Sequence, residues 1–297
     1  MKDLKQYQME LDLIVEQSAN YGKIIPEVYA LNYFIFNQQK QKQLPPSIKK
    51  QIKIKNEKLN IILTPQILPD EEKIKYRYLN AIDFDVLNYI IWKASHRINK
   101  LPIVIVSLNE ISSLMKYNKQ KIKESLTLLS SYKTHFENEK YYGILPNQFF
   151  ENYIINQGKQ TQVKLTTHLH QWIINNKHLV MNYKQMFQLN NRISKLLYIR
   201  IICSNVAELN QFKQHTFQLF NFFQFANSFG IKTDVKYQKM RVKKELKEGL
   251  EELKEHKIIH SYKIINKHPE LNIECVLCPQ FNQQTSLSNI VKQKMFS

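Results

Sequence analysis

The sequence predicts an α+β protein, because a helix-turn-helix pair followed by a hairpin is predicted twice along the chain. The 297 residues are enough for two domains, and 43% hydrophobic residues with 11% aromatic residues supply packed cores. We therefore expect two domains in tandem, after a short N-terminal extension.

The first stretch opens with a helix, a strand and a second helix. From Ala81 to His96, apolar residues at 82, 86, 87, 90, 91 and 94 recur at the spacing of one buried helical face. Leu101 to Val106 is a β-branched run that predicts a strand. Ser107 then caps the second helix, and Glu110 completes a capping box three residues later.

A third helix and a hairpin complete this stretch. The helix runs from about Asn118 to Tyr132, with Ile122, Leu126 and Leu129 as its apolar stripe. The predicted strands of the hairpin region are YKTHF, KYYGILP and FFENYII, from 132 to 155. Helix, strand, helix, turn, helix and hairpin is the order of a winged helix, so we expect a first winged-helix domain at residues 76–160.

A second winged-helix domain is expected at residues 161–280, followed by a polar tail at 281–297. Its predicted elements, in chain order, are a strand at 162–167 and helices at 168–175, 192–204, 216–229 and about 234–257. The helix at 216–229 is rich in aromatic residues and must pack on another element. HSYKII and LNIECVL are the strands of the closing hairpin.

The long helix near Arg241 carries the strongest indication of function. Its apolar stripe, which predicts a buried face, is Val242, Leu246, Leu250 and Leu253. Arg241 and Lys244 lie nearly opposite that stripe, counting about 100° per residue. Residues 232–247 hold seven basic and two acidic residues, whereas four glutamates crowd the rest of the helix. This division is typical of a recognition helix whose first half alone enters a groove lined by phosphates, whereas a merely solvated face mixes the signs.

The whole chain is strongly basic. Its 43 Lys and Arg against 25 Asp and Glu give a net charge of +18 at pH 7, which indicates a polyanionic partner, nucleic acid before an anionic membrane. No apolar stretch approaches the roughly 20 residues of a spanning helix, so we expect no membrane partner. Seven lysines and Pro45-Pro46 fall between Lys40 and Lys58, which predicts an exposed basic linker within residues 1–75, with or without a specific contact.

Composition excludes several kinds of chemistry. Five widely separated glycines cannot form a phosphate loop or a dinucleotide fingerprint, which disfavours an ATP-driven helicase. Three cysteines are too few for a disulfide framework, and the N-terminus lacks the apolar core of a signal peptide, so we expect a cytoplasmic protein. No paired carboxylates or Ser/His/Asp set stands at an identifying spacing, and we expect no cofactor and no enzymatic activity.

Two segments resemble one family of proteins. The run SKLLYIRIICS (194–204) resembles the arginine-leucine-tyrosine helix in the second domain of theta-type, iteron-binding plasmid replication initiators. The segment VKYQKMRVKKELKEGLEELKEHKII (235–259) and the tandem winged-helix order look like this family too. The resemblance covers roughly residues 76–279. The region before Tyr76 departs from it, because it lacks the serine-asparagine start that usually precedes the first helix.

The resemblance implies a function and a division of labour. Such initiators bind direct repeats at an origin; their second winged helix gives most of the base readout, and the first adds phosphate contacts and dimerisation. Monomers open the origin, and dimers often repress their own promoter. The implied DNA-binding residues are Lys236, Lys239, Arg241, Lys243, Lys244 and Lys247 in the second domain, and Asn118, Lys119, Lys121 and Lys123 in the first. Expected partners are double-stranded DNA, the host replication helicase machinery and a second copy of the chain. Two helices in successive major grooves predict a repeat of roughly 20 base pairs.

His168-Leu169-His170 supports a rival hypothesis. Rolling-circle initiators and relaxases use His-apolar-His to hold a divalent metal for nicking DNA, with both imidazoles on one strand face and a tyrosine nucleophile nearby. Thr166 or Thr167 looks like a helix cap instead, after which the two histidines diverge by about 200°. A Tyr-x-x-x-Lys spacing occurs only upstream, at Tyr117 to Lys121.

A lone CxxC is the other candidate for a metal site. Cys275 and Cys278 form it, and His256 with His260 would complete four zinc ligands. Residues three apart on a strand face opposite sides, which favours buried cysteines and ordinary histidines, so we expect no metal; zinc binding remains open from the sequence. Three functions are then in play: a DNA-binding initiator, a transcriptional regulator with the same domains, and a metal-dependent nicking enzyme.

Overall fold

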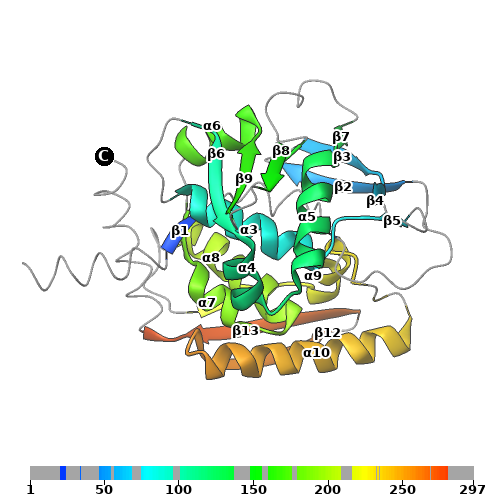
Figure 1. The fold of residues 1–297 in the computed structure, drawn as a ribbon. Coiled ribbons are helices and arrows are strands. Elements are labelled where there is room, and N and C mark those ends of the chain that lie inside the picture. The colour runs from blue at the N-terminus through cyan, green and yellow to red at the C-terminus, as the bar shows by residue number, and fades with distance from the viewer. Residues whose placement is uncertain are drawn as a thin grey trace, which may run out of the picture. The chain divides into compact units, whose positions relative to one another are not determined.

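The computed structural model describes residues 21–24, 34, 47–54, 57–68, 75–95, 101–136, 148–155, 160–175, 179–208, 216–231, 233, 235–267 and 269–279. Helices and antiparallel sheets are mixed along the chain, as the α+β prediction requires (Figure 1). The chain divides into two compact units. We call Ile25–Lys177 with Gln224–Lys239 the amino-terminal unit. We call Met1–Ile24, His178–Phe223 and Met240–Ser297 the carboxy-terminal unit.

The amino-terminal unit is organised around one buried helix and a three-stranded sheet of order β6-β9-β8. Its elements are β2 (Ile48–Ile54), β3 (Glu57–Leu63), β4 (Gln66–Leu68), β5 (Lys75–Arg77), α3 (Ala81–Ser95), β6 (Ile103–Ser107), α4 (Leu108–Met115), α5 (Lys119–Ser131), β7 (His135–Phe136), β8 (Phe150–Ile155), β9 (Gln160–Leu165) and α6 (Thr167–Asn175).

Helix α3 is buried around most of its circumference, more than the single face predicted from its apolar spacing. Two of its buried polar residues, Asp83 and Asn88, have hydrogen-bond partners. Asp83 accepts two bonds from the Arg77 guanidinium and one from the backbone N–H of Asn80 at 2.7 Å. Asn88 donates its side-chain amide to the carbonyl of Phe84 at 2.8 Å. Burial raises the pKa of Asp83, while Arg77 and the hydrogen bonds oppose that rise.

Helices α4 and α5 confirm the predicted helix-turn-helix pair. Ser107 caps α4 by accepting the backbone N–H of Glu110, whereas the Glu110 carboxylate forms an ion pair with Lys93 at 2.6 Å. Lys116 has a φ of 58°, so the chain reverses there and α5 begins at Lys119. Two contacts fix this turn: Ser112 donates to the carbonyl of Tyr117 at 2.7 Å, and the Tyr117 hydroxyl donates to Asp85 at 2.8 Å.

The hairpin of this unit differs from the prediction. Of YKTHF only His135 and Phe136 form a strand, β7, which pairs with β3, whereas nearly all of FFENYII forms β8, which pairs with β9. KYYGILP lies outside the described residues. The strand predicted at 162–167 as the opening of the second domain is β9, the central strand of the first sheet. Its alternation places Thr161, Val163 and Leu165 on the buried face, which explains the pairing.

The predicted basic linker is wrong for the described residues between 48 and 63. Strands β2 and β3 form an antiparallel hairpin there, and β3 buries Ile61 and Leu63 completely. Ile48, Ile52 and Ile54 fall at the same parity along β2, which Lys50 interrupts, and this period of two outweighs the charge that suggested an open arm. Lys49 is exposed on this strand.

The remaining elements belong to the carboxy-terminal unit, apart from α9 and α10, whose residues fall in both ranges. They are β1 (Tyr21–Ile24), β10 (Leu179–Asn182), α7 (Tyr183–Gln188), α8 (Arg192–Glu208), β11 (Thr216–Leu219), α9 (Phe222–Ser228), α10 (Lys236–Glu255), β12 (Ile259–Lys267) and β13 (Glu270–Leu277). The predicted helices at 168–175, 192–204 and 234–257 and the predicted closing hairpin are all present.

The predicted aromatic helix at 216–229 is wrong in its first part. Thr216–Leu219 is strand β11, paired with β13 so that Phe217 lies opposite Cys275. Phe217 and Leu219 are buried while their neighbours are exposed, a period of two that a helix cannot satisfy. Asn221, at a φ of 52°, then turns the chain into α9, and its backbone N–H donates to Asn272 at 2.9 Å.

One order of elements is present twice. The first series is α3-β6-α4-α5-β7-β8-β9 and the second is α8-β11-α9-α10-β12-β13; the orders agree apart from β7, which pairs with β3. The sheets also share one order, β6-β9-β8 and β11-β13-β12, in which the first strand pairs with the last. The recurrence predicted from the sequence is therefore found in the structure, with β9 as the last strand of the first series.

Arg77→Met should lower the free energy of unfolding by about 3 to 5 kcal/mol near pH 7, because it leaves the buried Asp83 carboxylate without its cation. In this variant burial still raises the pKa of Asp83 and Arg77 no longer opposes that rise, although the Asn80 N–H still does, so stability is retained below the ordinary Asp pKa and lost as the pH rises. Urea unfolding between pH 3 and 8 measures both effects. Lys164→Met, which removes a partly exposed ion pair with Glu151, should cost less than about 1 kcal/mol. Equal losses of unfolding free energy in the two variants would contradict the conclusion that Arg77 stabilises the buried Asp83 carboxylate.

Candidate nucleic-acid interface

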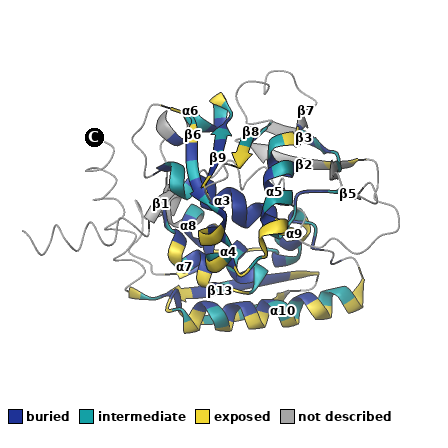
Figure 2. Cartoon of the chain, in the orientation of Figure 1, coloured by how far each residue is buried: buried dark blue, intermediate teal, exposed yellow. Residues whose placement is uncertain are grey.

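Helix α10 carries exposed as well as buried residues along its length (Figure 2), and basic residues are concentrated in the first half of its sequence. The stripe predicted to be buried, Val242, Leu246, Leu250 and Leu253, is at most 3% exposed. The side chains of Arg241 and Lys244 are 50% and 81% exposed. Lys236 and Lys247 are exposed, and Lys239 and Lys243 are partly exposed. All six predicted basic residues of this helix therefore reach the surface, with the leucines behind them.

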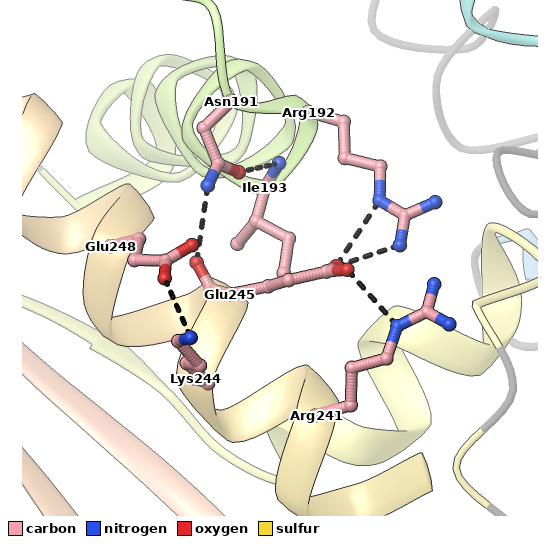
Figure 3. A network of polar contacts seen from close by, with 7 residues as sticks. All are labelled: Asn191, Arg192, Ile193, Arg241, Lys244, Glu245 and Glu248. Atoms are coloured by element: carbon pink, nitrogen blue, oxygen red, sulfur yellow. Dashed lines mark hydrogen bonds and ion pairs between the residues drawn. The ribbon is translucent and has the colours of Figure 1, made fainter.

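Glu245 holds Arg241 and Arg192 on one carboxylate (Figure 3). Arg192, at the start of α8, donates to Glu245 Oε2 through Nη2 at 2.7 Å and Nε at 3.3 Å. Arg241 donates its Nε to Oε1 at 3.4 Å, four residues before Glu245 on the same helix. This contact with Glu245 uses Nε and not the two Nη groups. The two Nη groups form the edge of the guanidinium that can donate to two acceptors side by side.

The second half of α10 is fixed against the start of α8. The Glu252 carboxylate accepts the backbone N–H groups of Asn190 at 2.7 Å and Asn191 at 3.0 Å, where a helix N-terminus favours negative charge. Ser194 donates its hydroxyl to the Gly249 carbonyl at 3.0 Å. A Cβ at Gly249 would lie 3.2 Å from both the backbone N and Oγ of Ser194, so the two helices meet where a side chain is missing.

These contacts change the interpretation of the acidic half of α10. The sequence suggested only that its glutamates stay away from phosphates. Glu252 instead binds backbone more than 60 residues away, and Glu251 accepts the Tyr262 hydroxyl of β12 at 2.6 Å. Burial and that hydrogen bond raise the pKa of Tyr262 to about 12. Sequence reasoning missed these roles, although a glycine inside a 20-residue helix, which costs about 1 kcal/mol relative to alanine, was a usable sign of a close contact.

The amino-terminal unit carries the second set of predicted residues at the first turns of α5. Asn118, Lys119 and Lys121 are exposed, and Lys123 is partly exposed. Asn118 is the N-cap of α5 and accepts the backbone N–H of Lys121 at 2.8 Å. The structure thus gives Asn118 a capping role that was not predicted from the sequence. The neighbouring lysines lie at the positive end of the helix, where an anion is favoured.

The residues of the nicking hypothesis do not form its site. His168 and His170 lie on α6, whose start is capped by Thr166 Oγ1 accepting the N–H of Leu169 at 3.4 Å. On a helix the two side chains diverge by about 200°, and burial lowers the pKa of His170. Tyr117 is part-buried against Asp85; burial, with that carboxylate, raises its pKa, which suppresses the tyrosinate that a nucleophile needs.

The CxxC residues lie at the end of β13. Cys275 is buried, and burial raises the pKa of its thiol to about 12. The pKa of Cys278 is also raised by burial. Within the described part of the chain, no three His, Cys, Asp or Glu side chains are gathered so that they could hold a metal ion. In the same residues, no helix is both long enough and apolar enough to cross a membrane.

No protein-family model and no curated protein sequence matches the chain. Solved structures, in contrast, are similar to the chain. Domains 2 and 3 of RctB share 8% identity at a TM-score of 0.50, covering 84% of this chain and 96% of that one. A second structure of the RctB domains 2-3 shares 9% identity at a TM-score of 0.48, covering 88% and 99%. The Pi initiator protein in complex with iteron DNA shares 14% identity at a TM-score of 0.48, covering 67% and 91%.

At 8% identity, the likeness to RctB domains 2 and 3 establishes a shared fold.

Glu252→Gln should lower the free energy of unfolding by about 1 to 2 kcal/mol, because the neutral amide keeps one acceptor and loses its charge at the start of α8. Glu255→Gln makes the same charge change at an exposed position and should alter stability by less than about 0.5 kcal/mol. Thermal and urea unfolding of both variants measure the difference. A loss in Glu255→Gln as large as in Glu252→Gln would show that only net charge matters.

Proposed function

We propose that this chain is a replication initiator that binds double-stranded direct repeats at a plasmid origin. The observation that carries the proposal is the first half of α10, a basic surface held in a fixed position by buried leucines and by the contacts of Glu252 and Gly249 with α8. A polyanion with a groove as wide as a helix is the partner that fits such a surface.

Tandem winged helices are the fold that we infer from the repeated order of elements. Apart from β7, which pairs with β3, both series consist of a helix, a strand, two helices and two strands, with the first strand beside the last. In this fold the helix after the turn is the recognition helix, which assigns that role to α5 and α10. The first domain then extends to Leu165, the end of β9.

Double-stranded DNA would be bound by both helices. The basic residues of α10 supply base readout and phosphate contacts, and Lys119, Lys121 and Lys123 of α5 supply phosphate contacts. Two helices in successive major grooves cover a repeat of roughly 20 base pairs. We further propose that a monomer opens an adjoining AT-rich segment in the cytoplasm and recruits the host replication helicase machinery, and that a homodimer represses the protein's own promoter.

Footprinting separates initiation from simple regulation. An initiator should protect several blocks of about 20 base pairs, all in one orientation and beside an AT-rich segment, in the DNA that flanks its gene. A transcriptional regulator with the same domains should protect only an inverted repeat at a promoter. That second pattern would overturn the initiator role and keep the DNA-binding role.

We propose that the protein acts by binding and has no nicking activity. The helical position of His168 and His170 and the contact of Tyr117 with Asp85 support this. Supercoiled plasmid carrying the flanking DNA, incubated with the full chain and Mn²⁺, should stay supercoiled. Relaxed circles or a covalent tyrosyl adduct would contradict the proposal.

Arg241→Ala should weaken binding to the specific site by about 1 to 3 kcal/mol and leave binding to random DNA nearly unchanged, if its Nη groups contact a base. Lys121→Ala should weaken specific and random DNA alike and reduce the salt dependence by about one phosphate contact. Titrations of both duplexes at several salt concentrations measure these effects. Equal losses on the two DNAs for Arg241→Ala would refute base readout.

Glu245→Gln should reduce the ratio of specific to random binding about tenfold, because the contact that orients the Arg241 guanidinium is weakened. Its affinity for random DNA should not fall, since a negative charge near the phosphates has been removed. Glu248→Gln is the matched control, because it makes the same charge change on the same helix beside Lys244 and leaves Arg241 unchanged. A merely structural role for Glu245 would lower both affinities together.

A further inference from the structure

The first half of α10 exposes two large apolar side chains that the electrostatic account above does not use. Tyr237 is 74% exposed and Met240 is 63% exposed, on a helix whose other apolar side chains form the buried stripe. They are neighbours on the surface, since residues three apart lie on one helical face. Single apolar side chains are common on protein surfaces, whereas a neighbouring pair of large ones needs an explanation.

Their positions coincide with the DNA-facing side of the helix. At about 100° per residue, Tyr237 and Met240 each lie about 40° from the basic residue four positions later, Arg241 and Lys244 respectively. The four side chains span an arc of about 100°, and the centre of that arc is opposite Leu246 in the buried stripe. Any duplex that reaches Arg241 and Lys244 must therefore pass over Tyr237 and Met240.

The chemistry of the major groove supplies a partner for this mixed surface. Its edges present hydrogen-bond donors and acceptors, and its apolar group is the thymine C5-methyl. A surface in which apolar side chains alternate with cations fits thymine methyl groups set between phosphates and acceptor atoms. A protein partner is a poorer match, because Lys236 and Lys239 lie beside the pair and interface cores are depleted in charged residues.

We propose that Tyr237 and Met240 are specificity-determining residues that contact thymine methyl groups, and that they make the site prefer A·T pairs beside the base read by Arg241. This rests on the proposed function of α10 as a recognition helix. Tyr237 precedes Arg241 by four residues, which is about 6 Å along the helix axis at 1.5 Å per residue. At about 3.4 Å per base pair, the thymine therefore lies within about two base pairs of the base that Arg241 reads. That base is identified as the one for which the Arg241→Ala variant loses its preference.

Deoxyuridine tests the proposal, because it differs from thymidine only by the missing methyl group. Sites are first selected from random duplex DNA with the full chain, and each thymine of the selected site is then replaced in turn. Replacement at one or two thymines within about two base pairs of the Arg241 contact should weaken wild-type binding about fourfold, which corresponds to about 0.8 kcal/mol for one buried methyl group. Replacement elsewhere should have no such effect.

Tyr237→Ala and Met240→Ala should each bind the thymine and deoxyuridine duplexes equally at the position that the deleted side chain contacts. Tyr237→Phe should keep the fourfold difference, because the ring and not the hydroxyl makes the contact. Leu101→Ala is the matched control: it removes an apolar side chain of similar exposure, 65%, from the amino-terminal unit and should keep the full difference. Both α10 positions are exposed, so thermal unfolding should match the wild type.

The outcomes separate this inference from the function on which it rests. If no sequence is enriched by selection, the proposed function fails. If a sequence is enriched but no deoxyuridine position near the Arg241 contact weakens binding, the thymine contact is overturned. The same holds if the alanine variants keep the fourfold difference, or if they lose affinity equally on both duplexes, as a contact to sugar or phosphate would produce. Variants that alter only self-association would identify a protein-docking surface instead.

Discussion

The approach of α10 to the start of α8 at Gly249 is the constraint on which the candidate interface depends. Ser194 donates to the Gly249 carbonyl, and one turn away the Glu252 carboxylate accepts two backbone N–H groups that have no partner within α8. A helix held only by leucines can rotate or slide, because apolar contacts are not directional. The polar contacts fix its rotation, and that rotation decides which side chains face outward.

The same acidic residues that secure the helix also shape its charge. Glu245 lies between Arg192 and Arg241, so it joins the contact with α8 to the exposed basic surface. A guanidinium that is already oriented loses less side-chain freedom when it binds a partner. The division of charge along α10 thus has two causes. Its basic half is exposed, as the proposed binding of a polyanion requires, and part of its acidic half is retained for internal contacts.

The sequence predicted elements that depend on local patterns and failed where partners are distant. The stripe from Val242 to Leu253 and the Ser107 cap were predictable, since a helical period and an N-cap are decided within a few residues. The strand β11 was mistaken for a helix because four residues are too short to distinguish a period of two from an aromatic helix. The place of β9 could not be read, because strand pairing links residues about 60 positions apart in sequence. For the site, charge and exposure were predictable, whereas the Asn118 cap and the Glu252 contact were not assigned.

A comparison of the two helix-turn-helix pairs shows how different residues meet one requirement. In the amino-terminal unit, the turn before α5 is fixed from within by Tyr117 donating to Asp85 of the buried helix α3. In the second series, α10 is fixed along its length by α8, the first helix of that series, through Gly249, Glu245 and Glu252. The first arrangement joins α3 to the turn that leads into α5, and the second joins α8 to α10, in each case by a polar contact. A recognition helix needs such a contact more than a core helix does, because half of its surface must stay unburied for DNA and cannot contribute to its own support. Polar contacts on the buried side are therefore expected in a helix that keeps a basic face exposed.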